Sequence, residues 1–548
     1  MLQQRYLASL AAACLLGGAG AVFAQTAPPP VAPQVNPGLI NQQNQRNQRE
    51  IQQQTAPTSP TQLVIPPGRT IPAAPAPGGP TVVIKQVVFD KSKFLSKAEL
   101  DALAAKYIGA RVDISQIQKL VKSVNDLYAA KGVATGNAYL PPQTLDNGVL
   151  HIGLVEGKLG AMTVKGASRL SADYLRDRIG EEPGQVVDTN QLANRLAAFN
   201  RTGVAQVQAS LQAGSQFGLT NIQLAVTEPP ANSLSLFVDD QGVPSVGRYE
   251  GGFLYQSYAP LGVDDRFTLY GVFADGDASV DGAYNLPFDR SGGRLGFSAS
   301  YGAIRVIHGA FESLDIRGAS TTVATNASQP IFVNQHWLIL ANAAISYINT
   351  TSRQAAVEVT ADTTDKGTGG LTVGYTDPHF SANVAANYSR AQTDIAVTNT
   401  SQVYNLYNGT FSGLLHLPSR FDVLVDGAFQ ASSAPLLTGD QLFQIGGPTT
   451  VRGYSTDAVA GSSGFYANFE LHHDLSLVNR DLTGFVFYDR GSVYNPKPAV
   501  TTLNSMGLGL TMAIRKNVTA DLTAGFPITQ AFDKQPSCEI YFRLTAKL

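Results

Sequence analysis

The last 317 residues of the chain are segments of about ten residues in which apolar and polar side chains alternate, separated by short turns. In one segment Leu295, Phe297 and Tyr301 alternate with small or polar residues. A period of two is that of a β-strand with one apolar and one polar face. Strands of a transmembrane barrel and of a soluble β-sandwich both show it. About sixteen segments are more than one sandwich uses, so the pattern favours a barrel.

The N-terminus predicts export. Residues 1–24 carry one basic residue, Arg5, then an apolar run that ends in a small-residue cleavage pattern, with Ala24 and Gln25 on either side of the expected cut. A lipoprotein signal at Cys14 is an alternative, although the apolar run continues past that residue. Beyond residue 24 no stretch of about 18 apolar residues occurs, so membrane insertion would require a closed barrel. We therefore expect a transmembrane antiparallel β-barrel of about 16 strands over residues 230–548.

Composition argues against several other classes of function. Cys14 would leave with the signal peptide, so Cys538 would remain without an intrachain partner. The formal net charge of −2 gives no electrostatic reason to expect nucleic acid as a partner. Phosphate-binding, serine-hydrolase and zinc-protease motifs are absent, so no catalytic residue, metal or cofactor is predicted. An outer-membrane enzyme remains as a minor alternative.

The segment at residues 25–80 cannot form a core, because it holds 13 of the 30 prolines and is rich in Gln and Asn. Within it, residues 39–54 lack Gly and Pro and can form a helix that is polar on nearly every face. Such a helix is stable only in wet surroundings. A disordered periplasmic tether is the alternative.

Two small α/β units follow, at residues 81–157 and 158–229. In the first, a β-branched strand precedes a helix that opens with a capping box at Ser96 and Glu99 and extends to Lys106. A second helix is expected at 114–131, and two strands then flank an Asp-Asn-Gly turn. The order strand, helix, helix, strand, strand recurs in the second unit. We expect strands there at 161–165, 204–212 and 221–227, and helices at 171–179 and 189–200.

Two motifs carry the candidate functional residues of the barrel. A long connection, residues 431–463, contains Val451, Arg452, Gly453 and Tyr454. A later strand contains Phe487, Asp489 and Gly491, which a period of two places on one face, with Tyr488 on the other. The arginine and the aspartate are a candidate pair that would lock the loop inside the barrel, with Gly453 allowing a close approach.

The order of these motifs in a strand-rich C-terminal domain resembles the signature of the Omp85 superfamily of outer-membrane barrels. In the first α/β unit the sequence from Ala138 to Gln143, and the later segment that ends at Glu156 and Gly157, resemble the first POTRA domain of two-partner secretion transporters of the haemolysin-activator type. The motif residues there are Tyr139, Leu140, Pro141, Gln143, Glu156 and Gly157. The chain departs from the family at Ala213, where proline is usual, and at Leu548, where phenylalanine is usual.

The resemblance implies an outer-membrane location in a Gram-negative bacterium, with two POTRA domains in the periplasm. It also implies a helix within residues 39–54 that plugs the barrel. The function implied is capture of a large unfolded exoprotein by the POTRA domains and its secretion through the barrel without nucleotide hydrolysis. An insertase that assembles other outer-membrane proteins is the alternative, although insertases generally carry three or more POTRA domains.

The further partners implied are outer-membrane lipid and lipopolysaccharide, together with the barrel-assembly machinery and periplasmic chaperones during biogenesis. An unfolded client exposes backbone hydrogen-bonding groups, so strand addition to a POTRA sheet edge would bind it with little sequence dependence. The candidate edges are residues 138–140 and 204–212.

Overall fold

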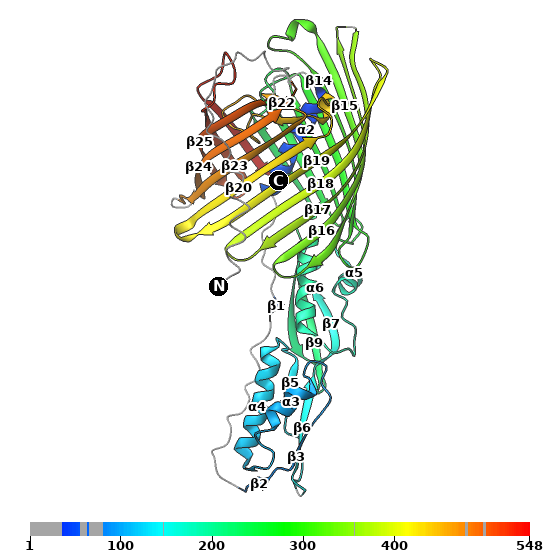
Figure 1. The fold of residues 1–548 in the computed structure, drawn as a ribbon, viewed down its shortest axis with the longest axis vertical. Helices are drawn as coiled ribbons and strands as arrows, with labels where there is room; N and C mark the ends of the chain where they lie inside the picture. The colour runs from blue at the N-terminus through cyan, green and yellow to red at the C-terminus, as the bar shows by residue number, and fades with distance from the viewer. Residues whose placement is uncertain are drawn as a thin grey trace.

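The protein consists of a β-barrel with a polar helix inside it and a column of two α/β units at one end (Figure 1). The computed structural model describes residues 36–54, 63–64, 80–145, 147–355, 357–456, 458–476, 481–496 and 500–548. The expected signal peptide, its Ala24 and Gln25 cleavage site and most of the linker lie outside these ranges. Within these ranges no helix has both the length and the apolar character needed to cross a membrane.

Sixteen antiparallel strands of the described residues form the closed barrel, which confirms the predicted fold class and strand number. The barrel closes where the first strand pairs with the last, through five residue pairs from Ser235 with Lys547 to Asp239 with Arg543. The strands are β10 (Asn232–Asp239), β11 (Glu250–Tyr258), β12 (Arg266–Ala274), β13 (Asp277–Pro287), β14 (Arg294–Arg305), β15 (Ile316–Val333), β16 (Trp337–Gln354), β17 (Val357–Thr376), β18 (Phe380–Ile395), β19 (Thr400–Leu417), β20 (Phe421–Ser432), β23 (Ser463–Asp474), β24 (Leu482–Tyr494), β25 (Val500–Arg515), β26 (Val518–Pro527) and β27 (Glu539–Lys547).

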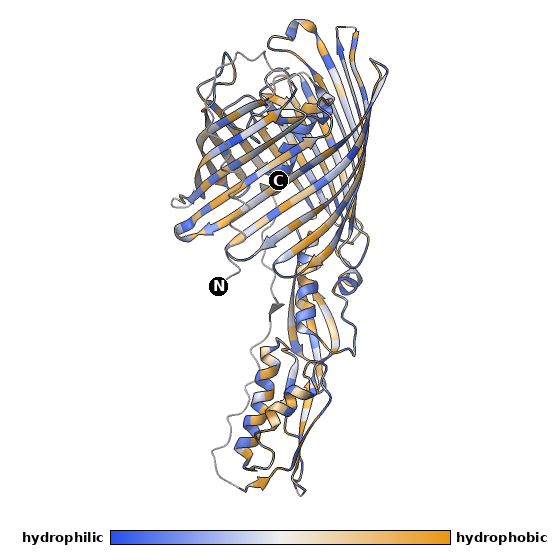
Figure 2. Cartoon of the chain, in the orientation of Figure 1, coloured by the Kyte–Doolittle hydropathy of each residue, from blue (hydrophilic) through white to orange (hydrophobic). Residues whose placement is uncertain are grey.

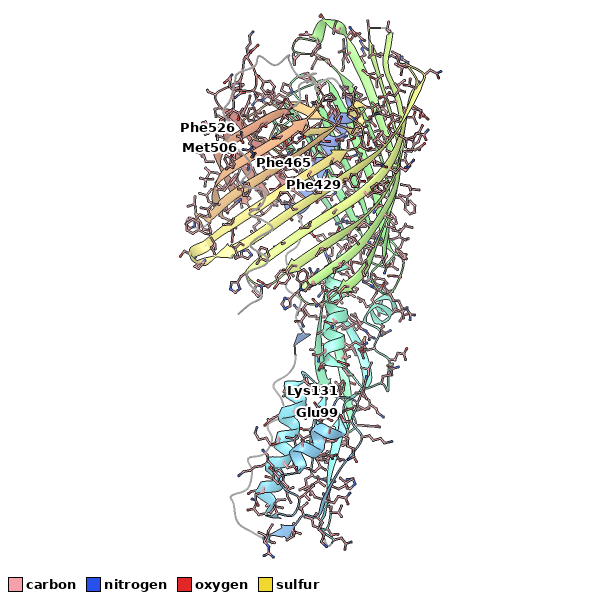
Figure 3. The ribbon with its side chains drawn as sticks, in the orientation of Figure 1. Glu99, Lys131, Phe429, Phe465, Met506 and Phe526 are labelled. Carbon is pink, nitrogen blue, oxygen red and sulfur yellow. The ribbon has the colours of Figure 1, made fainter. Side chains whose placement is uncertain are left out.

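Hydrophobic and hydrophilic residues alternate along the barrel strands (Figure 2), which places them on opposite faces of the wall. Phe429 and Phe465 are paired on adjacent strands, as are Met506 and Phe526, and these side chains lie on the outside of the wall (Figure 3). Inward positions such as Thr364 and Ser389 are buried. The outer surface therefore suits lipid, and the inner surface suits water or polar chain.

The longest connection between barrel strands, residues 433–462, turns back into the lumen. It contains a small hairpin of β21 (Phe443–Ile445) and β22 (Val459–Gly461). Apolar side chains of the loop pack against Val493 and Leu503 of the barrel wall in a buried cluster. The loop is therefore held by packing as well as by polar contacts.

The first α/β unit has a sheet in the order β3-β6-β5 with its helices packed on it. Its elements are β2 (Val82–Val83), β3 (Gln86–Phe89), α3 (Lys97–Ala104), β4 (Arg111–Val112), α4 (Ile114–Ala130), β5 (Gly136–Tyr139) and β6 (Val149–Glu156). The expected capping box is present at Ser96 and Glu99. Helix α3 ends at Ala104 and does not reach Lys106. A hydrogen bond from Lys131 at 2.8 Å (Figure 3), with others from Ser96, lowers the pKa of Glu99 to about 2.

The second unit repeats this architecture around its own buried core. Its elements are β7 (Lys158–Lys165), α5 (Ala172–Ile179), α6 (Thr189–Thr202), β8 (Gln206–Ala213) and β9 (Leu219–Thr227). Strand β7 begins three residues before the expected Ala161, because a register shift between Leu159 and Met162 interrupts the alternation. The four-stranded sheet has the order β1-β8-β9-β7, in which β1 (Leu63–Val64) comes from the linker.

Candidate functional site

Arg452 lies in the lumen with its guanidinium between two carboxylates of the barrel wall. Its Nε and Nη2 donate to Asp489 Oδ2 and Oδ1 at 2.8 and 2.7 Å, and its backbone N–H donates to Oδ2 at 3.0 Å. Nη1 donates to Glu470 Oε1 at 2.6 Å. The Phe487 ring stacks under the guanidinium, with its centroid 3.6 Å from Cζ. This bidentate geometry fixes both the position and the orientation of the loop.

Strand β24 presents the partner motif to the lumen. Phe487 and Asp489 are buried, whereas Tyr488 is 39% exposed on the outer wall. Gly491 lies under the loop: a Cβ there would be 2.8 Å from Val451 Cγ2. A side chain at this position would therefore push the loop off the wall.

Gly453 and Tyr454 are held by Tyr541, which lies on β27, the last strand of the barrel. The backbone N–H of Gly453 donates to the Tyr541 hydroxyl at 3.0 Å, and that hydroxyl donates to the Tyr454 carbonyl oxygen at 2.7 Å. Gly453 has φ +88°, and an added Cβ would lie 3.0 Å from the Gly525 backbone. The loop is thus clamped between β24 and β27.

The polar helix α2 (Pro37–Gln54) lies inside the barrel beside this loop (Figure 1). Its amides donate to acids of the wall: Asn44 to Asp277 at 3.0 Å, and Gln48 to Asp281 at 2.9 Å. Arg46 Nη2 donates to Gln444 Oε1 of the loop at 2.8 Å. The helix begins two residues before the expected 39–54 and ends at the expected residue.

Ile40 and Ile51 supply apolar anchors in two buried clusters of the wall. The polar contacts of the helix with the barrel are otherwise made by its side chains, among the described residues. No backbone ladder joins α2 to the wall among the described residues. Such a helix can leave the barrel without breaking a sheet.

Arg543 on the last strand was not singled out by the sequence, although it occupies a central position in the structure. It is 2% exposed and donates from Nε to Asp239 Oδ2 at 2.8 Å across the seam between β27 and β10. Its Nη1 donates to Glu50 of the helix at 3.2 Å, and its Nη2 to Gln241 Oε1 at 2.5 Å. The sequence feature that could have indicated its role was a lone arginine on the inward face of the last alternating segment. Arg543 joins the seam, the helix and the loop that follows β10.

The POTRA-like motif residues of the first unit hold its strands and its junction with the second unit. The Gln143 side chain donates to the His151 carbonyl oxygen and accepts from the His151 N–H. The Glu156 carboxylate accepts from the backbone N–H groups of Lys93 and Phe94. The Tyr139 ring meets Phe217 of the second unit edge-on, with centroids 5.5 Å apart. A Cβ on Gly157 would overlap the Thr220 hydroxyl. Leu140 packs against the core, and Pro141 follows it at the end of β5.

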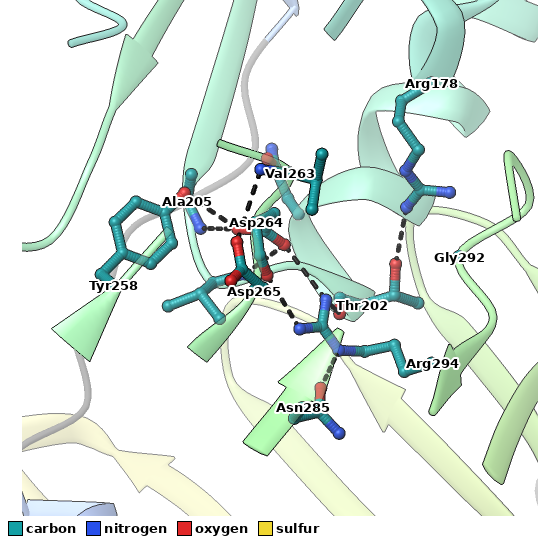
Figure 4. A network of polar contacts seen from close by, with 12 residues as sticks. Arg178, Thr202, Ala205, Tyr258, Val263, Asp264, Asp265, Asn285, Gly292 and Arg294 are labelled. Atoms are coloured by element: carbon teal, nitrogen blue, oxygen red, sulfur yellow. Dashed lines mark hydrogen bonds and ion pairs between the residues drawn. The ribbon is translucent and has the colours of Figure 1, made fainter. Parts of the chain in front are cut away.

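Asp264 joins the second unit to the barrel (Figure 4). It is fully buried in the turn between β11 and β12 and accepts from the backbone N–H groups of Val204 and Ala205 at 3.0 to 3.1 Å. Tyr258 donates to it at 2.9 Å, and Arg294 pairs with it at 3.2 Å. The second unit is therefore hydrogen-bonded to the barrel mouth.

No group of three or more His, Cys, Asp or Glu side chains in the described part of the chain is arranged to hold a metal. Arg452 and Arg543 in the lumen pair with carboxylates of the wall, and Arg543 also pairs with the helix. These pairs hold helix α2 and the loop inside the barrel. A closed barrel with a periplasmic α/β column and a loop clamped in its lumen defines an outer-membrane protein transporter.

Comparison with known proteins specifies the family. Residues 218–513 match the family described as haemolysin secretion/activation protein ShlB/FhaC/HecB, and residues 82–157 match the ShlB-type POTRA domain. The chain therefore belongs to the haemolysin secretion/activation family. It is a two-partner secretion transporter of the outer membrane, with its POTRA domains in the periplasm and a secreted exoprotein as its partner.

Named relatives agree with this assignment. The outer membrane transporter CdiB of Dickeya dadantii is 24% identical over 84% of this chain and 85% of the relative. The heme/hemopexin transporter protein HuxB of Haemophilus influenzae is 25% identical over 72% of each chain. The solved structure of CdiB from Escherichia coli has a TM-score of 0.71 at 19% identity and covers 93% of this chain and 98% of that one. That structure shows that the fold is shared.

Proposed function

We propose that the POTRA domains capture an unfolded exoprotein and pass it through the barrel along its axis. Helix α2 and the loop at 433–462 fill the lumen between transport events. The main support is that the lumen contents are held by side chains, whereas the wall itself is closed by a continuous ladder. A pore of this kind opens when the helix leaves, without loss of the barrel.

The barrel seam favours axial transport over the insertase alternative. Besides the five residue pairs, the seam carries the buried pair of Arg543 with Asp239. Arg248 adds a bridge to Asp240 and Glu539, at 3.2 and 3.3 Å. Opening the seam sideways would separate several charge pairs at once.

Transport without a nucleotide requires another source of free energy. Folding of the exoprotein outside the cell removes the unfolded chain from the pore and so pulls the equilibrium outward. The apolar outer wall would contact lipid and lipopolysaccharide. Delivery of the transporter to the membrane would use periplasmic chaperones and the barrel-assembly machinery, which would recognise the last strand β27 together with Leu548 that follows it.

The test of this function uses as candidate exoprotein a large secreted β-helical protein, to be sought in the gene beside the transporter. Cells that carry both genes should release it into the medium, and cells without the transporter should retain it in the periplasm. Retention in both strains would refute the proposal.

The plug role of α2 can be tested by conductance across planar lipid bilayers. Glu50→Gln removes the charge that pairs with Arg543, so we expect the helix to leave more often and the open-pore current to appear more frequently. Arg49→Gln is the matched control, because Arg49 is exposed on the same helix and, among the described residues, its side chain donates only to the Gln45 carbonyl oxygen within the helix. Equal opening of wild type and Glu50→Gln would argue against the plug.

A further inference from the structure

The sheet edge of the first POTRA unit is already blocked. Both backbone groups of Ala138 in β5 are taken by one side chain of α4: its N–H donates to Asn125 Oδ1 at 2.6 Å, and Asn125 Nδ2 donates to its carbonyl oxygen at 3.1 Å. The N–H of Gly136 donates to the Val133 carbonyl oxygen. Two prolines follow at 141 and 142, where no N–H is available. This edge has almost no free hydrogen-bonding group for an added strand.

The second unit has the same asparagine clasp, but a longer edge extends beyond it. Asn200 of α6 accepts from the N–H of Val207 at 2.7 Å and donates to its carbonyl oxygen at 2.8 Å. Every second residue of a strand points its backbone groups to the same side. The backbone groups of Ala209, Leu211 and Ala213 therefore point to the same side as those of Val207, and no asparagine of the described residues clasps them.

A strand already sits on that edge. Leu63 and Val64 of the linker pair in parallel with Ala209 and Ser210 of β8. Only eight residues, 55–62, separate this dipeptide from the end of helix α2. The structure thus shows that the edge accepts an extended chain, and that its present occupant is tied to the lumen helix.

A cavity of about 600 Å³ opens where the ladder stops at Asn200. It lies between the second POTRA unit, the inner wall and the end of the helix. The residues lining it are Gln52, Asn200, Thr202, Gly203, Val204, Gln206, Arg266, Thr268, Ala283, Asn285 and Arg294. Arg294 is paired with Asp264, whereas Arg266 has no ion pair among the described residues. The cavity is therefore polar, and the Arg266 guanidinium on its wall is free of any close ion pair with a described residue.

We propose that the edge of β8 from Ala209 to Ala213 is the docking site for an extended segment of the exoprotein, which replaces the linker dipeptide. Asn200 ends the ladder, so the bound chain leaves the sheet at Val207 and enters the cavity. Arg266 there binds carbonyl or carboxylate groups of the passing chain. Replacement of the dipeptide frees the linker that restrains the helix, so docking favours opening. The inference rests on the proposed function and adds where the client binds.

The test uses a disulfide bond that holds the linker dipeptide on β8. In a Cys538→Ser background, Val64→Cys with Ser210→Cys joins register partners of β1 and β8. Oxidation should lower secretion several-fold, and a reductant should restore it. The matched control is Asn137→Cys with Val155→Cys, register partners in the first unit, which should secrete normally. Normal secretion by a chain whose 64–210 disulfide has formed would overturn the inference, and the proposed function would still stand.

A second measurement locates the client directly. A photo-crosslinking residue at the exposed Gln212 or at Ala283 in the cavity should capture an unfolded N-terminal fragment of the candidate exoprotein. The same residue at the exposed Asn137 on the first unit should capture little. Capture at Asn137 equal to that at Gln212 would refute the assignment to β8.

Discussion

Arg452 is a buried cation whose charge is balanced by two carboxylates on neighbouring strands. Its side chain is 8% exposed, and those of Asp489 and Glu470 are 0% and 11% exposed. Removing one member of such a cluster leaves the others uncompensated in a site with little water, which costs about 3 kcal/mol or more. The second carboxylate was not expected from the motifs, because Glu470 belongs to neither of them.

The first prediction concerns this cluster. Arg452→Ala should lower secretion and weaken the attachment of the loop inside the channel. Both effects should be larger than the loss in assembly of the barrel. Arg452→Lys should recover only part of the loss, because an ammonium group cannot reproduce the bidentate fork and the third bond to Glu470 together. Secretion and heat stability of the purified protein provide the measurements.

A double-mutant cycle with Asp489→Asn distinguishes a lock from two independent residues. If the pair acts as a unit, the double variant should be less impaired than the sum of the single variants. Additive losses would mean that the contact does not hold the loop in solution.

At the scale of elements, the seam between β10 and β27 determines the route of the client. It combines a short ladder with the ion pairs of Arg543 and Arg248. The second prediction is that a closed seam is compatible with transport. In a Cys538→Ser background, Leu236→Cys with Ala546→Cys joins register partners across it. Secretion should be the same with the disulfide formed or reduced, because the client moves along the axis.

The control for that experiment is the single Leu236→Cys variant, which cannot form the bridge. A secretion defect confined to the oxidised double variant would indicate lateral opening, and it would favour the insertase alternative.

At the scale of the whole molecule, hydrogen bonds join the two α/β units to each other and to the closed barrel. Asp264 fixes the second POTRA unit at the barrel mouth, and Thr189 joins the two units through hydrogen bonds with the backbone at Gly132 and Ala134. The third prediction is that the protein fractionates with the outer membrane and runs faster on gels without boiling. A closed ladder resists detergent until heated, and recovery of the chain in the soluble periplasm would contradict it.

The sequence by itself determined the barrel, because alternation is a local property. A strand places successive side chains on opposite faces whatever lies next to it, so apolar outer and polar inner faces can be predicted residue by residue. The same rule placed Asp489 inward and Tyr488 outward. Helix ends and the start of β7 were displaced by a few residues, because a cap or a bulge depends on neighbouring strands.

Only the tertiary structure decided which distant residues meet. Glu50 and Arg543 are 493 positions apart, and they come together because the barrel closes around a helix with one register and not another. The linker dipeptide on β8 and the clasp of Asn200 on Val207 likewise depend on packing between elements. Local geometry repeats along a chain and can be recognised in it, whereas closure and register are properties of the assembled sheet.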